Sequence, residues 1–137
     1  MKIALPMVTM SNLLMIDISI WHKEKHKFVN MLIACDTGAS VTTISNDLLQ
    51  KLGYDTTIGK LKRITTASTV DYVKSVAVDK IMIGETTTHT LNDIEVYAHT
   101  FPEESFASGV LGLNFFSQFD SVNFVFCQKI MEFIKND

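Results

Sequence analysis

The chain has 137 residues, of which 47% are hydrophobic, and this is enough for one packed domain spanning residues 1–137. The formal net charge of -3 and the isoelectric point near 5.7 offer no basic surface, so nucleic acid is not an expected partner. No apolar run is long enough to cross a bilayer, and the apolar run within residues 1–8 is too short for the central region of a signal peptide. We therefore expect a soluble, cytoplasmic protein without a membrane partner.

The first predicted elements form a hairpin. Residues 13–21 alternate between apolar and polar side chains, with Ile16, Ile18 and Ile20 on one face, which is typical of a half-buried strand. A polar turn follows at residues 22–27, and residues 28–35 return as a second strand.

The middle of the chain predicts a short helix and a second, longer hairpin. Residues 41–44 are β-branched and indicate a short strand. Residues 45–53 begin with a capping serine and end with a glycine, as a two-turn helix does. Two extended runs between residues 63 and 83 flank the polar segment 67–71, which predicts a long hairpin.

The last third predicts mainly strands. Residues 94–99 alternate as a strand, residues 101–105 indicate a loop, and residues 110–112 form a short apolar strand. A short helix is expected at residues 114–119, followed by strands at 121–126 and 129–135. The fold class predicted from these elements is all-β with one or two short helices.

Asp36 is the residue that most needs an explanation. It ends the apolar run 31–35, and a carboxylate at the buried tip of a strand is costly unless it has a partner or a use. Thr37 adds a hydroxyl, and Gly38 permits a sharp turn and a close backbone approach. Asp36, Thr37 and Gly38 are therefore the candidate catalytic residues.

The two cysteines and four histidines suggest no alternative chemistry. Cys35 adjoins Asp36, but neighbours along a strand point to opposite faces and no histidine is placed to activate the thiol. With Cys127 it makes too few cysteines for a disulfide framework. The histidines lack metal-ligand spacing and no glycine-rich phosphate loop is present, so neither a metal nor a cofactor is expected.

A second motif supports the assignment of the acid. The sequence Gly109-Val-Leu-Gly-Leu-Asn114 follows the Asp-Thr-Gly triplet by about seventy residues. In this combination the chain resembles the retropepsin-like aspartic proteases. The resemblance implies a closed single-lobe β-barrel, a flap formed by the hairpin at residues 63–83, and a polypeptide substrate.

The resemblance also implies a two-fold homodimer. Aspartic proteases need one carboxylate to take a proton from water and another to give one to the substrate carbonyl. This chain carries the motif once, since Asp55 and Asp120 are not followed by the glycine. A two-fold axis would place Asp36 opposite the partner's Asp36.

The remaining site residues follow from the same resemblance. Thr37 would brace the two acid loops across the axis, and Gly38 would leave room for the substrate main chain. Alanine at position 39, where pepsins often have serine, predicts a working pH above that of pepsin. The positions expected to bind substrate follow the acid or lie at the flap tip: Ala39, Ser40, Ala67, Ser68, Thr69 and Val70.

Three departures point to the cellular or bacterial branch of the family and away from the viral one. No glycine lies between Gly59 and Gly84, so the flap lacks the glycine-rich tip of retroviral enzymes. Ser40 and Leu113 replace an aspartate and an arginine that pair in those enzymes, which predicts a weaker dimer. The C-terminal strands could form an intersubunit sheet or complete the sheet of their own subunit.

Two other functional classes remain open from the sequence. One is a peptide-binding or assembly module of the same fold without proteolysis, which the glycine-free flap favours. The other is a monomeric β-barrel that binds a small molecule.

Overall fold

The computed structural model describes residues 1–65, 69–101 and 108–136, and strands dominate it, so the predicted all-β class is confirmed. The strands are β1 (Lys2–Pro6), β2 (Val8–Met10), β3 (Leu13–His22), β4 (Lys27–Cys35), β5 (Thr43–Ser45), β6 (Leu61–Thr65), β7 (Val70–Ile83), β8 (His89–His99), β9 (Gly109–Leu111), β10 (Ser121–Val125) and β11 (Ile130–Ile134). The helices are α1 (Asn46–Lys51), α2 (Leu113–Phe116) and the 3₁₀-helix η1 (Phe126–Gln128).

The first predicted hairpin is present as β3 and β4. Ile16 lies opposite Ile33, and Ile20 lies opposite Val29. The isoleucines of β3 are buried whereas Asp17 between them is exposed, because side chains alternate between the two faces of a strand. The period-two pattern of the sequence therefore fixed which face packs inward.

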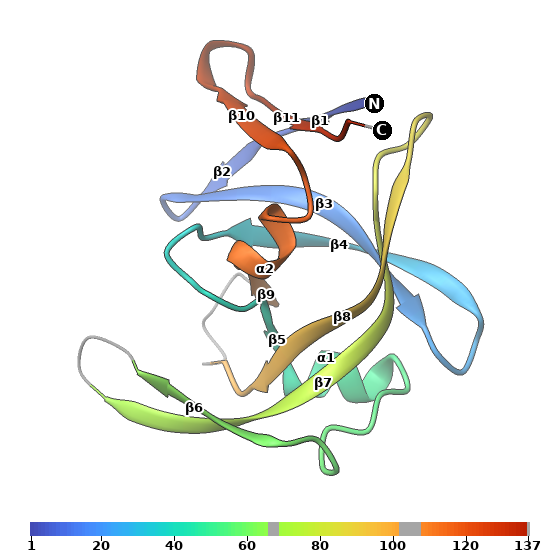
Figure 1. The fold of residues 1–137 in the computed structure, drawn as a ribbon, viewed down its shortest axis with the longest axis vertical. Coiled ribbons are helices and arrows are strands. Elements are labelled where there is room, and N and C mark those ends of the chain that lie inside the picture. The colour runs from blue at the N-terminus through green and yellow to red at the C-terminus, as the bar shows by residue number, and fades with distance from the viewer. Residues whose placement is uncertain (66–68, 102–107, 137) are drawn as a thin grey trace.

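The sheet that contains this hairpin closes on itself. Its strand order is β2-β3-β4-β9-β5-β8-β7-β6, and β3 also pairs with β7, which completes a ring. The pairings β4–β9 and β5–β8 are parallel, and the others are antiparallel. The closed barrel expected from the resemblance is thus confirmed, with β2 and β6 extending beyond the ring (Figure 1).

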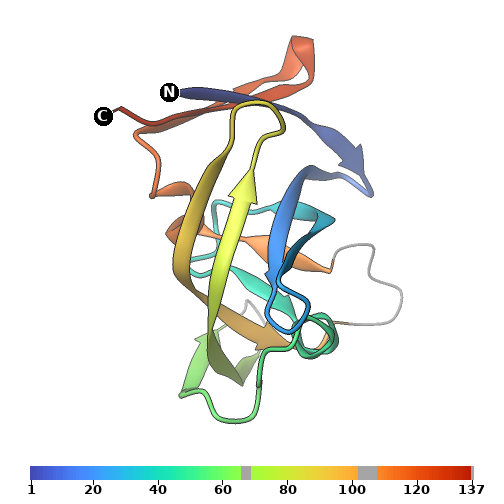
Figure 2. The same cartoon turned by 90° about the vertical axis from the view of Figure 1, so that its right-hand side faces the viewer.

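A separate three-stranded sheet, in the order β1-β11-β10, joins the two ends of the chain. It lies at one end of the barrel, opposite the β6–β7 hairpin, and Figure 2 shows the same arrangement from the side. The strands predicted at residues 121–126 and 129–135 are present here as β10 and β11, and β11 pairs with β10 on one side and with β1 of the same chain on the other. The sequence analysis missed β1, although the burial of Ile3, Leu5 and Met7 follows the period of a strand.

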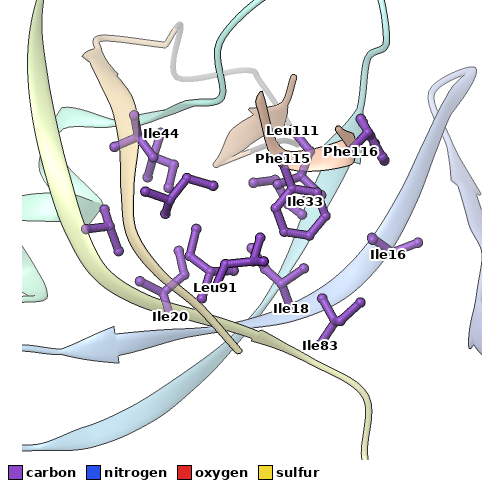
Figure 3. Packing of buried hydrophobic residues seen from close by; sticks show 14 of the residues in the cluster. Ile16, Ile18, Ile20, Ile33, Ile44, Ile83, Leu91, Leu111, Phe115 and Phe116 are labelled. Atoms are coloured by element: carbon purple, nitrogen blue, oxygen red, sulfur yellow. The ribbon is translucent and has the colours of Figure 1, made fainter. Parts of the chain in front are cut away.

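The barrel interior is filled by aliphatic side chains from strands far apart in the sequence, as Figure 3 shows. Isoleucines from β3, β4 and β5 meet Leu111 of β9 and Leu91 of β8 there. The side chains in this group that are completely buried are Ile16, Ile20, Ile33, Ile44 and Leu111.

Phenylalanines connect the barrel to the terminal sheet. Phe133 of β11 is completely buried, and its ring centroid lies 6.2 Å from that of Phe115 in α2 and 5.0 Å from that of Phe119. Phe116 stacks on Phe133 at 6.4 Å. The position of the terminal sheet is therefore fixed by α2.

The predicted helices are present with shifted ends. The helix expected at residues 45–53 spans Asn46–Lys51, and the Ser45 side chain accepts a hydrogen bond from the Leu48 N–H at 3.4 Å as its cap. The helix expected at residues 114–119 spans Leu113–Phe116, because the extended Gly112 starts it one residue earlier. The described parts of the chain contain no helix that is long and apolar enough to span a membrane.

Phe133→Ala should remove the ring that holds α2 against the terminal sheet. We expect the free energy of unfolding to fall by about 3–5 kcal/mol, because a large buried aromatic leaves a cavity. Urea denaturation at one fixed protein concentration measures this. Ile58→Ala, at a side chain that is 80% exposed, should change the same quantity by less than about 0.5 kcal/mol. Equal losses in the two variants would contradict this description of the core.

Candidate active site

Asp36 directly follows β4 and is tied to the second motif. The Asp36 N–H donates to the Leu111 carbonyl at 3.0 Å, which extends the parallel pairing of β4 with β9. In that pairing Ala34 lies beside Val110 and Cys35 beside Leu111. The apolar strand of the second motif thus runs next to the strand that carries the acid, as the resemblance predicted.

A tight turn orients the carboxylate. The Gly38 N–H donates to Asp36 Oδ1 at 2.9 Å, and the Ala39 N–H donates to the Asp36 carbonyl at 3.1 Å. A Cβ at Gly38 would lie 3.1 Å from Asp36 Oδ1, so a side chain there would crowd the hydrogen-bonded oxygen. The turn therefore holds one carboxylate oxygen in place and favours glycine at position 38.

The expected burial of Asp36 is wrong for the single chain. Asp36, Thr37, Gly38 and Ser40 are exposed, and Ala39 is half-buried. β4 ends at the surface of the barrel, and the described residues of one chain leave the turn uncovered. The Thr37 hydroxyl also has no hydrogen-bond partner within residues 1–65, 69–101 and 108–136.

Buried Thr42 and half-buried Asn114 fix the rest of the acid loop. Thr42 is completely buried, and both its N–H and its hydroxyl donate to Asn114 Oδ1 at 2.8 Å. The same hydroxyl accepts from the Gly112 N–H at 3.1 Å, and Asn114 Nδ2 donates to the Glu95 carbonyl at 2.7 Å. These bonds join the acid loop, β8 and the start of α2.

The start of α2 packs directly on the acid loop. The Leu113 N–H donates to the Ala39 carbonyl at 2.8 Å, and the Asn114 N–H donates to the Ser40 carbonyl at 3.1 Å. A Cβ at Gly112 would lie 2.7–2.9 Å from backbone atoms of Ala39 and Val41, so this approach requires glycine. The second glycine of the motif is thus explained by contact with the acid loop.

Sequence reasoning missed the role of Thr42. It placed this residue in a strand, whereas the observed strand begins at Thr43 and the backbone of Thr42 bonds to Asn114 and Tyr97. The available signal was a hydroxyl residue in a β-branched run shortly after the acid. Its partner lies 72 positions away, and a local pattern does not identify such a partner.

Cys35 does not have the properties of a nucleophile. Burial raises the pKa of its thiol to about 12, so the thiol stays protonated near neutral pH. Cys127, in contrast, is exposed in η1.

The predicted flap is an antiparallel hairpin of β6 and β7, with Arg63 opposite Tyr72 and Thr65 opposite Val70. Of the expected substrate-binding positions at its tip, Ala67 and Ser68 lie outside the described residues. Thr69 and Val70 are described and are exposed. Figure 1 shows the acid loop after β4 on the same side of the molecule as the end of β6 and the start of β7.

The closed single-lobe barrel, with an Asp-Thr-Gly turn packed against a glycine-bearing strand and helix, defines the retropepsin-like class. A crystal structure of a retropepsin-like aspartic protease from Rickettsia conorii has the same fold, with a TM-score of 0.69. The alignment covers 97% of this chain and 89% of that one at 18% sequence identity.

The sequence itself identifies the family. Residues 24–118, more than half of the chain, match the model of the family described as "gag-polyprotein putative aspartyl protease", and the chain belongs to this family. A search of the curated proteins gave no significant match.

Thr42→Val keeps the shape of the side chain and removes its hydroxyl. The buried Gly112 N–H then loses its acceptor, and we expect the free energy of unfolding to fall by about 1–3 kcal/mol. Urea denaturation measures the change. Thr43→Val is the matched control, because the Thr43 hydroxyl reaches only the Val41 carbonyl at 3.5 Å. A similar loss of unfolding free energy in the control would mean that the Thr42 hydrogen bonds do not stabilise the fold more than those of Thr43.

The raised pKa of Cys35 predicts selective labelling. Iodoacetamide reacts with thiolates, and a pKa of about 12 leaves very little Cys35 thiolate near neutral pH. Mass spectrometry should therefore find Cys127 modified well before Cys35 in the folded protein. Both cysteines should react in denaturant. Preferential modification of Cys35 in the folded protein would contradict its assigned environment.

Proposed function

We propose that this protein is an aspartic endopeptidase whose active site forms between two copies of the chain, with Asp36 contributed by each. The observation that carries the proposal is the Asp36 turn, which is exposed, held in one orientation and backed by rigid hydrogen bonds. Membership of an aspartyl protease family supports the chemistry. The proposed substrate is an extended polypeptide bound between the acid loops and the flaps.

The other aspartates that resemble the motif do not supply the second acid. The Asp55 carboxylate accepts from the Thr57 hydroxyl at 2.6 Å and from the Thr57 N–H at 2.9 Å, and these bonds hold its pKa below the ordinary value. Asp120 accepts from the Asn136 N–H near the C-terminus. Both carboxylates thus already accept hydrogen bonds from other residues of the chain, which supports the partner's Asp36 as the second carboxylate.

The chemistry follows from placing two carboxylates together. Two such groups at close range share one proton, so the pair contains a base and an acid at once. The ionised carboxylate takes a proton from a water molecule, whose oxygen then attacks the carbonyl carbon of the scissile peptide bond. The protonated carboxyl gives its proton to the carbonyl oxygen. The resulting diol collapses as a proton passes to the amide nitrogen, the C–N bond breaks, and two shorter peptides leave.

The neighbouring residues have positioning roles in this proposal. The exposed Thr37 hydroxyl would bond to the partner's acid loop and brace the two turns. Gly38 leaves space for the substrate main chain above the carboxylates. The exposed residues Ala39, Ser40, Thr69 and Val70 would contact substrate side chains.

Asp36→Asn should abolish peptide cleavage and leave the fold intact. An amide neither takes a proton from water nor shares one with a second acid, and Asp36 is exposed, so its replacement costs little stability. Cleavage of an unfolded protein or peptide library, followed by mass spectrometry across a range of pH, measures the loss.

Asp17→Asn is the matched control, because Asp17 is an exposed aspartate on β3 outside the acid loop. It should retain the wild-type rate. Full activity in Asp36→Asn would overturn the proposal. A wild-type dimer without Asp36-dependent cleavage would favour a peptide-binding module of the same fold.

A further inference from the structure

The β6–β7 hairpin carries an excess of positive charge. We call its described residues 60–65 and 70–74 the flap ribbon. Four of these residues are cations and one is an acid: Lys60, Lys62, Arg63, Lys74 and Asp71. The whole chain, in contrast, has a formal net charge of -3. A region of net positive charge in an acidic protein thus coincides with the hairpin that the family resemblance identifies as the flap.

The flap ribbon extends beyond the barrel as two strands. β7 pairs with β8 from Lys74 onward, whereas residues 70–73 pair with β6 alone in the described parts of the chain. In that pairing Arg63 lies opposite Tyr72, and Lys62 lies opposite Val73. Side chains of directly opposed residues share one face of a two-stranded ribbon, so the register assigns each cation to a face.

The two faces of the flap ribbon differ in burial. Val73 is 4% exposed, and Lys62 and Ile64 on the same face are half-buried, so this inner face is turned toward the rest of the protein. The outer face carries Arg63 and Tyr72, which are both exposed. A polypeptide bound beneath the ribbon would meet the inner face, where Lys62 is the cation.

None of the four cations forms an ion pair within residues 1–65, 69–101 and 108–136. The ion pair found there joins Lys2 to Glu132, in the terminal sheet. Asp71, the acid of the flap ribbon, lies opposite Ile64 and accepts a hydrogen bond from the Tyr72 N–H at 2.8 Å. The positive charge of the ribbon is therefore available to a bound molecule.

The flap ribbon lies on the same side of the molecule as the Asp36 turn (Figure 1). In the proposed assembly, one ribbon from each copy would lie over the same substrate, and the positive charges of both would act on it. The two Asp36 carboxylates share a proton and add one negative charge. Opposite charges attract and like charges repel during an encounter, so this surroundings favours Asp and Glu over Lys and Arg in the substrate.

We infer that the substrates are acidic polypeptides, with Asp or Glu residues near the cleaved bond that face the cations of the flap ribbon. This inference rests on the proposed function, since it assigns the substrate class of the same site. Lys62 determines the preference at closest range, because it is the cation of the inner face. Lys60, Arg63 and Lys74 add attraction over the Debye length, which is about 10 Å at 0.1 M salt.

Two pools of synthetic peptides test the inference. The pools share a central stretch of random sequence and carry three Glu or three Lys residues on each side of it. We expect kcat/KM to be about tenfold higher for the Glu pool at 0.1 M salt. The net charge of -3 by itself favours the Lys pool, so this result would report the local charge of the ribbon.

Salt provides an internal check. At 1 M salt the Debye length falls to about 3 Å, and the ratio of the two kcat/KM values should fall toward one. Both pools are cut by the same dimer, so the ratio does not depend on how much dimer is present.

Lys62→Glu should lower the ratio of kcat/KM values by about tenfold, because the inner face then carries acids and no cation. Lys62→Gln should give an intermediate ratio. A merely structural role of Lys62 would slow both pools equally and leave the ratio unchanged. Lys25→Glu is the matched control, since it makes the same charge change at an exposed residue of the β3–β4 turn, on the opposite side of the molecule from the flap ribbon (Figure 1). It should keep the wild-type ratio.

Equal kcat/KM values for the two pools would overturn the inference and leave the proposed function standing. A preference that Lys62→Glu does not change, or that Lys25→Glu changes as much, would also overturn it. Failure of the proposed function gives a different result, which is no Asp36-dependent cleavage of either pool. Fluorescence anisotropy of the labelled pools with Asp36→Asn then measures binding alone. Tighter binding of the Glu pool would support the acidic preference, and equal or absent binding would overturn it.

Discussion

The contact between Thr42 and Asn114 is the constraint on which the site depends. One buried hydroxyl and one amide bind the acid loop, β8 and the start of α2 at a single point. Because the bond between the Gly112 N–H and the Thr42 hydroxyl is buried, breaking it leaves an unsatisfied donor away from water, and this cost opposes loosening of the loop. The position of the acid loop thus depends on these bonds, and the Gly38 N–H then holds the Asp36 carboxylate within the loop.

Asp36 is exposed in one chain and would be buried only in the proposed assembly. In one chain the carboxylate is solvated and costs little. Desolvation arises only when a second molecule covers the turn, and then the second carboxylate can share the proton and reduce the charge that must be buried. Assembly and acid-base chemistry are therefore coupled in the proposed enzyme, because the group that makes dimerisation costly is also the group that the dimer activates.

The phenylalanines between α2 and the terminal sheet have two structural roles. Phe133, Phe115 and Phe116 form part of the core, and they also connect the acid loop to β11 through α2. Ser40 and Leu113, where the resemblance led us to expect a charged pair, are both exposed and uncharged.

The sequence by itself determined the chemistry-bearing turn and the kind of each element. The period of two along β3 identified its buried isoleucines, Ser45 and Gly53 bounded α1, and the Asp-Thr-Gly turn with its second glycine motif indicated the fold. Short helix ends were misplaced by one to three residues, because the cap of α2 at Gly112 depends on contact with the acid loop. Local sequence patterns therefore predict those helices and strands whose ends depend on neighbouring residues in the sequence.

Tertiary structure alone decided which strands are neighbours, and with them the rest of the site. β4 meets β9, and Thr42 meets Asn114, across more than seventy residues of chain. No periodicity encodes such a meeting, because it depends on the closure of the whole barrel. The same holds for the exposure of Asp36, which follows from where the barrel surface lies, and for the pairing of β11 with both β1 and β10.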